Sequence, residues 1–226
     1  MSKERLYIFD TTLRDGAQTQ GVDFSLEDKE KIALALDKLG VDYIEAGWPG
    51  ANPTDTEFFQ KKHDFKNSKL TSFGMTKRSG RSAENDTGLS ALMNSNTSAV
   101  CLVGKSWDFH VDVALGITNE ENLDNISESA KHFVKAKKEF MFDAEHFFDG
   151  YKTNPKYAVS CIKAAYDQGA RWVVLCDTNG GNIVTISDAV KKYSGQVVRL
   201  ALMSAHYSQR LRWSQYFLRT LTFFLY

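Results

Sequence analysis

The sequence predicts an α/β protein of the (β/α)8-barrel type. Short apolar runs alternate with helical patterns, with one run about every 25 to 40 residues. The segment after the first run is not the glycine-rich turn G-x-G-x-x-G that a doubly wound nucleotide-binding sheet requires. Polar and charged residues instead follow several different runs, and this is the pattern at the C-terminal ends of barrel strands.

Length and composition are those of an ordinary globular protein. The chain has 226 residues, with 28 acidic and 28 basic side chains. No apolar run approaches the roughly 18 residues that a membrane span needs, and no signal-peptide segment follows Met1. Residues 1–188 hold all 28 acidic residues and 22 of the basic ones. We therefore expect a cytoplasmic protein with neither a membrane nor a nucleic acid as partner.

The first predicted strand covers residues 6–9, and candidate catalytic residues follow its end. Arg14 and Asp15 are neighbours in the polar segment that follows, and Gly16 lets the backbone turn there. A strand exit that carries only a surface salt bridge is the alternative interpretation of this stretch.

A helix and a second strand come next. Ser25 and Asp28 are typical of a helix N-terminus, and Gly40 of a helix end. A strand is predicted over residues 41–47, followed by a loop over residues 48–53, where prolines and glycines disfavour regular structure.

The alternation then continues through the chain. Further strands are predicted over residues 69–75, 99–103, 139–142 and 171–176, and helices over residues 120–137 and 155–168. Cys101, Cys161 and Cys176 lie in apolar segments, are too few for a disulfide framework, and are expected to be buried thiols.

Five motifs then resemble one enzyme family. They are FDTTLRDGAQ at residues 9–18, AGWPG at 46–50, GKSWDFHV at 104–111, FDAEHFFDGYK at 142–152 and LCDTNGG at 175–181. Together they resemble the 2-isopropylmalate and homocitrate synthases, which are metal-dependent barrels related to HMG-CoA lyase, and above all the citramalate synthases. That resemblance implies a homodimeric acyltransferase that condenses acetyl-CoA with pyruvate to give citramalate and CoA, in isoleucine biosynthesis. A 2-isopropylmalate synthase, which takes a larger keto acid for leucine biosynthesis, is the alternative.

The resemblance also implies roles for four residues. Asp15 matches the family's metal-binding carboxylate, for Mg²⁺, Mn²⁺ or Zn²⁺. Arg14 matches the arginine that stabilises developing oxyanion charge, and Glu145 a glutamate in proton transfer or in the water network beside the metal. Thr178 matches a threonine that binds the keto acid's carboxylate. As alternatives, Glu145 orients Arg14, and Thr178 caps a helix.

Five further polar residues are weaker candidates. Gln18, Glu45 and Asp143 are expected at the barrel mouth, with Gln18 as a substrate-binding residue, although each could simply hydrogen-bond the loops around it. His110 and His146 match no ligand of the family pattern, so we expect them to pack or to support other residues rather than to bind a metal.

The pattern of the family fails near the end of the chain. The family's strand seven carries a His-x-His pair, whereas residues 196–208 contain His206 followed by Ser208. Asp15 alone cannot hold a catalytic divalent ion. We therefore expect a partial catalytic barrel over residues 1–188, truncated after about six βα units and inactive.

Residues 189–226 form a second predicted region, with six basic residues, eight aromatic ones and no acid. We expect this basic-aromatic tail to be aberrant sequence, since its apolar residues lack the clean helical face of a membrane-surface segment. The alternative to an enzyme is a non-catalytic fragment that acts only by association with intact subunits.

Overall fold

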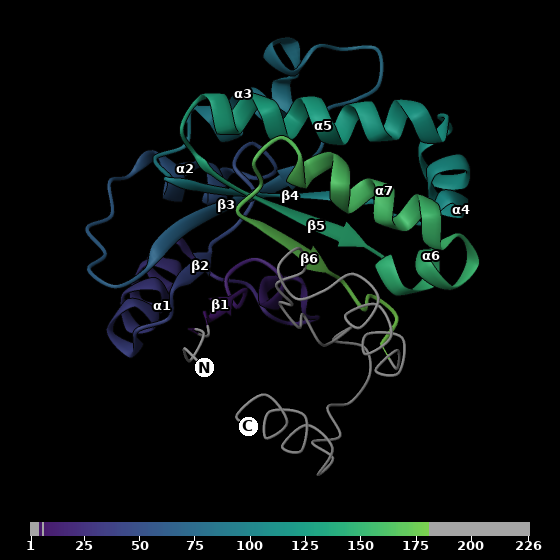
Figure 1. Cartoon of the computed structure of the whole chain (residues 1–226). Helices are drawn as coiled ribbons and strands as arrows, with labels where there is room; N and C mark the ends of the chain where they lie inside the picture. The colour runs from purple at the N-terminus through teal and green to yellow at the C-terminus, as the bar shows by residue number, and fades with distance from the viewer. Residues whose placement is uncertain (1–4, 6, 181–226) are drawn as a thin grey trace.

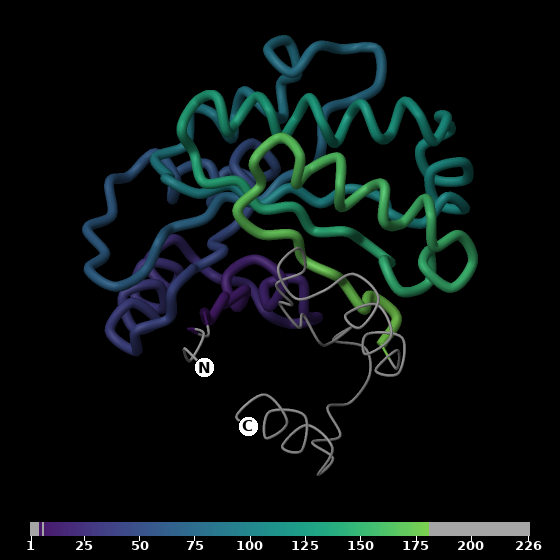
Figure 2. Tube along the Cα trace, in the orientation of Figure 1, coloured from purple at the N-terminus to yellow at the C-terminus, as the bar shows by residue number. Residues whose placement is uncertain are grey.

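Six parallel strands form a single sheet in the computed structural model, which describes residues 5 and 7–180. Their order in the sheet is their order in the sequence, and every neighbouring pair is parallel (Figure 1). The strands are β1 (Phe9–Asp10), β2 (Tyr43–Glu45), β3 (Lys69–Met75), β4 (Ala99–Lys105), β5 (Glu139–Glu145) and β6 (Trp172–Leu175). Figure 2 shows the same trace as a tube, with the colour changing along the chain from purple at the N-terminal segments to green at the C-terminal ones. The predicted α/β class is confirmed.

Helices connect the strands and cover the outer face of the sheet. They are α1 (Leu26–Leu39), α2 (Pro53–Gln60), α3 (Thr87–Met93), α4 (Asp108–His110), α5 (Asn119–Lys135), α6 (Phe147–Thr153) and α7 (Pro155–Tyr166). Two short 3-10 turns, η1 (Gly16–Gln18) and η2 (Ala83–Asn85), and a π-helical turn, η3 (Val111–Leu115), complete the connections. Helices α5 and α7 lie side by side over β4 and β5 (Figure 1).

The two faces of each strand have different neighbours, because successive side chains point to opposite faces of a sheet. In β5, Phe140 and Phe142 join the large hydrophobic cluster under the helices. Met141 belongs to a smaller cluster on the other face with Phe73 and Cys101. The inward face therefore continues from Met141 through the alternate residues of β5 to its C-terminal end.

The helix signals near the N-terminus are confirmed, and one loop prediction is wrong. Ser25 and Asp28 form a capping box on α1, and Gly40 ends the helix at φ 86°. Pro53, predicted to lie in a loop, is the first residue of α2, and Asn52 caps that helix. Proline is tolerated at this position because the first N–H of a helix has no partner within the helix.

Among the six described strands only β3 has its predicted range, because pairing decides where strands end; β2 and β6 are shorter than the predicted runs at 41–47 and 171–176. Only Phe9 and Asp10 of the first run pair with β2, at Tyr43 and Ile44. Strands β4 and β5 continue beyond the predicted apolar runs, since their ladder runs on to the pair of Lys105 with Glu145. Charged residues that suggested loops are therefore the last residues of strands.

The N-terminal ends of the strands are closed by a polar and aromatic cluster. The Tyr43 hydroxyl and the Lys69 ammonium both bond the Glu139 carboxylate, and Trp172 Nε1 donates to the Tyr43 hydroxyl at 3.0 Å. In barrel enzymes packing at this end serves stability, and the active site lies at the C-terminal ends of the strands.

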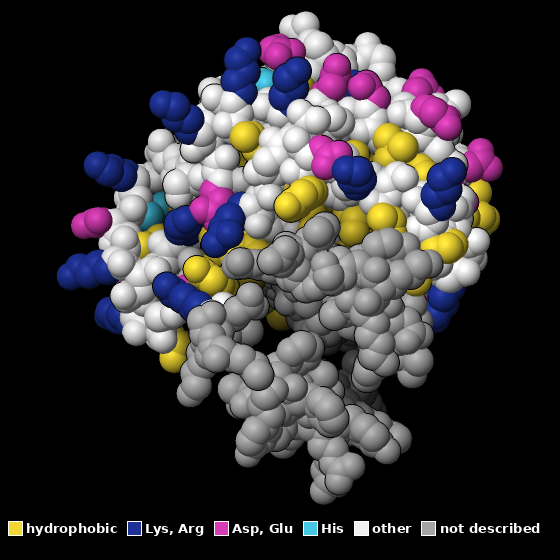
Figure 3. Space-filling model, viewed as in Figure 1, with side chains coloured by type: hydrophobic (Ala, Val, Ile, Leu, Met, Phe, Trp, Pro, Cys, Tyr) yellow, Lys and Arg dark blue, Asp and Glu magenta, His cyan; other side chains and the backbone are white. Residues whose placement is uncertain are grey.

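The surface and the thiols agree with the composition. Acidic and basic side chains are interspersed on the face shown in Figure 3. None of the helices within residues 7–180 combines the length and apolar character that crossing a membrane requires. Cys101 and Cys161 are buried and Cys176 is half-buried. The predicted boundary at residue 188 and the basic-aromatic tail lie outside the described residues.

The packing of α6 against the loop after β4 generates the first prediction. A Cβ on Gly150 would lie 2.4 Å from the Ser106 carbonyl oxygen and 2.9 Å from the Trp107 Cα. We expect Gly150→Ala to lower the free energy of unfolding by about 1–3 kcal/mol, because backbone atoms must move to admit the methyl group. Urea denaturation measures this. Gly16→Ala is the control, since its Cβ would meet nothing closer than 3.7 Å; an unchanged Gly150→Ala variant would contradict the packing.

Candidate active site

Arg14 is the centre of the candidate site at the C-terminal ends of the strands. Its Nε donates to Glu45 Oε2 at 2.6 Å and its Nη1 to Asp15 Oδ1 at 3.1 Å. The guanidinium lies 4.0 Å from the centroid of the Phe73 ring. Two carboxylates and an aromatic face fix the plane of the side chain, which arginine's rigid donor fork allows and a lysine would not.

Behind Arg14 lies a buried acidic cluster formed by Glu45, Asp143 and Cys101. Their ligand-type atoms lie within 4.8 Å of one another, and Glu45 Oε1 is buried without a hydrogen-bond partner among the described residues. Burial raises the pKa of Glu45 to about 7 and that of Asp143 to about 6, although the charge of Arg14 opposes both shifts. Burial also raises the pKa of the Cys101 thiol well above its ordinary value. The two carboxyls therefore keep their protons to a higher pH than ordinary carboxyls do, and the buried thiol stays protonated and is not nucleophilic.

A second polar group lies at the ends of β4, β5 and β6. Glu145 is the last residue of β5, and its carboxylate pairs with Lys105, the last residue of β4. Arg14 is held by Glu45 instead, so the alternative in which Glu145 orients Arg14 is wrong. Lys105 was missed in the sequence because only the strand register brings it opposite Glu145. Glu145 and Asp143 share the inward face of β5, which joins the two groups.

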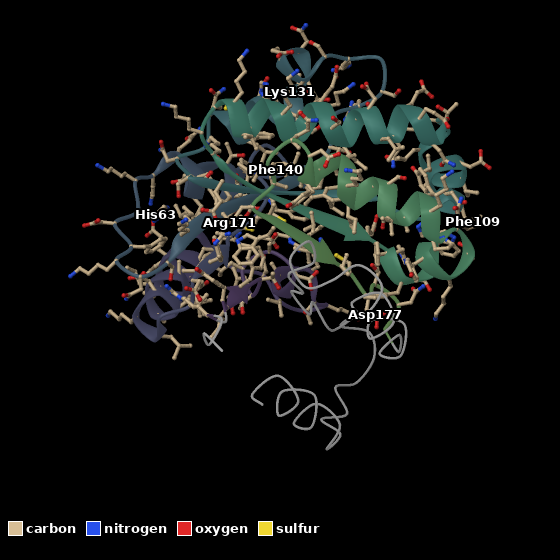
Figure 4. All side chains as sticks on the ribbon, in the orientation of Figure 1. His63, Phe109, Lys131, Phe140, Arg171 and Asp177 are labelled. Atoms are coloured by element: carbon tan, nitrogen blue, oxygen red, sulfur yellow. The ribbon has the colours of Figure 1, made fainter. Side chains whose placement is uncertain are left out.

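Thr178 follows β6 and meets the end of β5. Its Oγ1 accepts a hydrogen bond from the His146 backbone N–H at 2.9 Å. The alternative in which Thr178 caps the next helix concerns residues after Gly180, outside the described range. In Figure 4, Asp177 and Phe109 lie toward the ends to which the β5 and β6 arrows point, and His63 and Arg171 lie toward the opposite end.

The two histidines contact other side chains at this mouth. His146 Nδ1 lies 3.1 Å from Asp149 Oδ2. The His110 ring stands edge-on to the His146 ring, with 4.5 Å between centroids, and 4.7 Å from that of Trp107. Burial, followed by the neighbouring His146, lowers the pKa of His110. His110 therefore packs as a neutral ring, as a supporting residue would.

A cavity of about 360 Å³ opens beside Arg14. Gln18, in η1, lines it together with Arg14, while Trp48 contributes an aromatic wall from the loop after β2. The remaining lining residues are Leu13, Ala17, Val22, Asp23, Phe24, Lys29, Ala51, Asn52, Thr54 and Asp55. The structure thus brings Arg14 and Gln18 to one cavity, while Glu145 and Thr178 lie at the ends of β5 and β6 and do not line it.

Asp15, the predicted metal ligand, offers a carboxylate beside Arg14. Its carboxylate oxygens suit hard ions such as Mg²⁺ or Mn²⁺, and its side chain is 35% exposed. Glu45 and Asp143 are buried behind Arg14, whose charge opposes a nearby cation. Within residues 7–180 the accessible donors near Asp15 do not complete a coordination sphere for a divalent ion.

The buried carboxyls generate a prediction about pH. In the unfolded chain Glu45 and Asp143 have ordinary pKa values near 4, so between about pH 5 and pH 7 the folded chain binds more protons than the unfolded one. The stability that these protons contribute is present at the acidic end of this window and is lost as the pH rises. We expect the free energy of unfolding, measured with urea in EDTA, to fall by on the order of 1–2 kcal/mol from about pH 5 to about pH 8.

Two variants identify the source of this dependence. Asp143→Asn replaces a buried carboxyl by a neutral isostere and should flatten the curve, whereas Asp64→Asn makes the same charge change at an exposed position and should not. Parallel curves for Asp143→Asn and the original chain would refute the assignment.

Comparison with known proteins gives the chain its family. Residues 5–209 match the HMGL-like family. An (R)-citramalate synthase of Aquifex aeolicus is 54% identical over 182 residues, which cover 80% of this chain and 34% of the relative. A 2-isopropylmalate synthase of Caldanaerobacter subterraneus is 35% identical over 181 residues, covering 80% of this chain and 44% of the relative. The chain spans about a third of the length of the curated citramalate synthases it matches.

Solved structures support the fold. An HMG-CoA lyase of Pseudomonas aeruginosa superimposes with a TM-score of 0.68 at 15% identity, covering 88% of this chain and 68% of the lyase. An HMG-CoA lyase of Acinetobacter baumannii, solved with coenzyme A and 3-methylmalate, has a TM-score of 0.67 at 20% identity, covering 86% of this chain and 65% of that one. With six parallel strands in barrel order and this profile match, the chain belongs to the HMGL-like family, among relatives named (R)-citramalate synthase.

Proposed function

We propose that this chain carries the keto-acid-binding part of an active site that condenses acetyl-CoA with pyruvate. The observation that carries the proposal is the guanidinium of Arg14, which is fixed by two carboxylates and an aromatic ring at the wall of a cavity. The names of the relatives at 43–54% identity support pyruvate as the keto acid. The relatives named 2-isopropylmalate synthase are less similar, at 31–35% identity.

The condensation of acetyl-CoA with a keto acid requires three steps to be assisted by the protein. A base must take a proton from the acetyl methyl group, the resulting enolate must attack the ketone carbon of the keto acid, and positive charge must stabilise the alkoxide that forms. Water then hydrolyses the thioester and releases CoA.

Arg14 is suited to the oxyanion. Because its position is already fixed, little reorganisation is needed when negative charge develops. Its pKa is raised by the carboxylates, chiefly Glu45, against the opposing effect of burial, so it keeps its charge. We propose Gln18 as a second donor to substrate, since it lines the same cavity.

We propose that Glu145, at the end of β5, and Thr178, after β6, also act on the substrate. Thr178 would donate its hydroxyl proton to the keto acid's carboxylate. Glu145, paired with Lys105, would take part in proton transfer or order water near the reacting carbons. Asp143 supports this arrangement because it lies between Arg14 and Glu145 on the inward face of β5.

The choice of keto acid generates a prediction. We expect isothermal titration to show that the chain binds pyruvate more tightly than 2-oxoisovalerate. Arg14→Lys should weaken pyruvate binding by about 10-fold or more, since a lysine cannot bond Glu45 and Asp15 from one planar group stacked on Phe73. Lys38→Arg, an equally conservative change on the exposed face of α1, is the control. Tighter binding of 2-oxoisovalerate would favour the 2-isopropylmalate synthase alternative.

The incomplete donor set generates another prediction. We expect the chain to bind Mn²⁺ no more tightly than Asp15→Ala does, by electron paramagnetic resonance, and to release no CoA from acetyl-CoA and pyruvate. The reason is that one accessible carboxylate beside a guanidinium is too few donors for a divalent ion. Turnover that Arg14→Ala or Asp15→Ala abolishes would overturn this, and the chain would then complete the metal site with residues outside the described range.

A further inference from the structure

The turn from β5 into α6 is strained at His146. This residue adopts the left-handed conformation, with φ 54° and ψ 34°, and it is not a glycine. Such a conformation costs about 1 kcal/mol or more and persists only where the surroundings enforce it. The His146 side chain contacts Asp149, His110 and Trp107, and these contacts hold the turn in this conformation.

Asp149 supplies the central contact. Its Oδ2 lies 3.1 Å from His146 Nδ1 and also accepts a hydrogen bond from Asn179 Nδ2 at 2.9 Å. One carboxylate oxygen thus ties the turn after β5 to the loop after β6. The rings of His110 and Trp107 enclose the imidazole on another side, with centroids 4.5 and 5.9 Å from that of His146.

Thr178 is held by contacts with the turn after β5. Its neighbour Asn179 is bonded to Asp149, and its own hydroxyl oxygen accepts the His146 backbone N–H at 2.9 Å. A threonine hydroxyl has one proton to donate and can accept with its lone pairs. Accepting from His146 therefore orients the hydroxyl so that its proton points to a different partner.

We propose that Asp149 is a positioning residue for the substrate carboxylate, acting through His146 and Asn179 to aim the Thr178 hydroxyl. This inference rests on the proposed function and assigns a purpose to the strained turn. Asp149 itself does not touch the substrate. A preorganised donor binds an anion more tightly because less freedom is lost when the ligand arrives.

A double-mutant cycle on the full chain tests the proposal. We expect both Asp149→Ala and Thr178→Val to weaken pyruvate binding, measured by isothermal titration, by about 10- to 100-fold, as for loss of a hydrogen bond to a charged group. The double variant should bind no more weakly than Thr178→Val alone, because Asp149 acts only through Thr178. Additive losses would overturn the proposal, since a general structural defect is additive. Asp167→Ala, which breaks an exposed ion pair with Lys163, is the matched control.

Two further measurements keep the outcomes distinct. Hydrogen exchange at the His146 amide should be faster in Asp149→Ala than in the original chain, and unchanged protection would refute the contact without reference to any ligand. His146→Gly, which suits the left-handed backbone and removes the whole side chain, should also weaken pyruvate binding and covers the case in which Asp149→Ala does not fold. If the original chain binds no pyruvate, the proposed function fails, while the exchange experiment still judges the anchoring role of Asp149.

Discussion

The organisation of the barrel mouth depends on one buried guanidinium. Arg14 lies among Asp15, Glu45 and Asp143, two of which are buried, and its single positive charge cannot neutralise them all. Ionised carboxylates are costly in a poorly solvated site unless a cation or a proton compensates them. The raised pKa values of Glu45 and Asp143 express that shortage. Arg14 is thus both the anchor of the local structure and the candidate partner for a developing oxyanion.

The alternation of side chains along β5 extends this row of carboxyl groups across the sheet. Alternate residues face the same side, so Asp143 and Glu145 lie in one row and connect Arg14 on β1's loop to the polar group at the ends of β4 and β6. The intervening side chains, such as Phe142, pack outward under the helices. A single strand therefore supplies both core packing and chemistry, and a one-residue slip of its register would destroy both.

The two ends of the sheet divide stability from function. At the N-terminal end, Tyr43, Glu139 and Trp172 form a closed set of contacts. At the C-terminal end, Glu45 has a buried oxygen without a hydrogen-bond partner among the described residues, and His146 has a left-handed backbone. A buried polar atom without a partner costs free energy, so the Glu45 oxygen agrees with the position of sites at this end of barrel enzymes.

The sequence by itself determined the fold class, the family and both ends of the first helix. Those features depend on local signals, namely the period of the apolar residues, the caps at Ser25 and Gly40, and motifs that follow the strands. It also indicated that Arg14, Asp15, Glu45 and Asp143 share one end of the barrel, since the C-terminal ends of parallel strands lie on the same side.

Only the tertiary structure decided which of these groups meet. The pairing of Lys105 with Glu145, the choice of Glu45 over Glu145 as partner of Arg14, and the contact of His146 with Thr178 all join residues more than 30 positions apart. No local periodicity encodes such contacts, because they follow from strand register and from the turn that each loop makes after its strand. The sequence therefore predicts which residues reach the mouth, and the three-dimensional packing determines which of them act together.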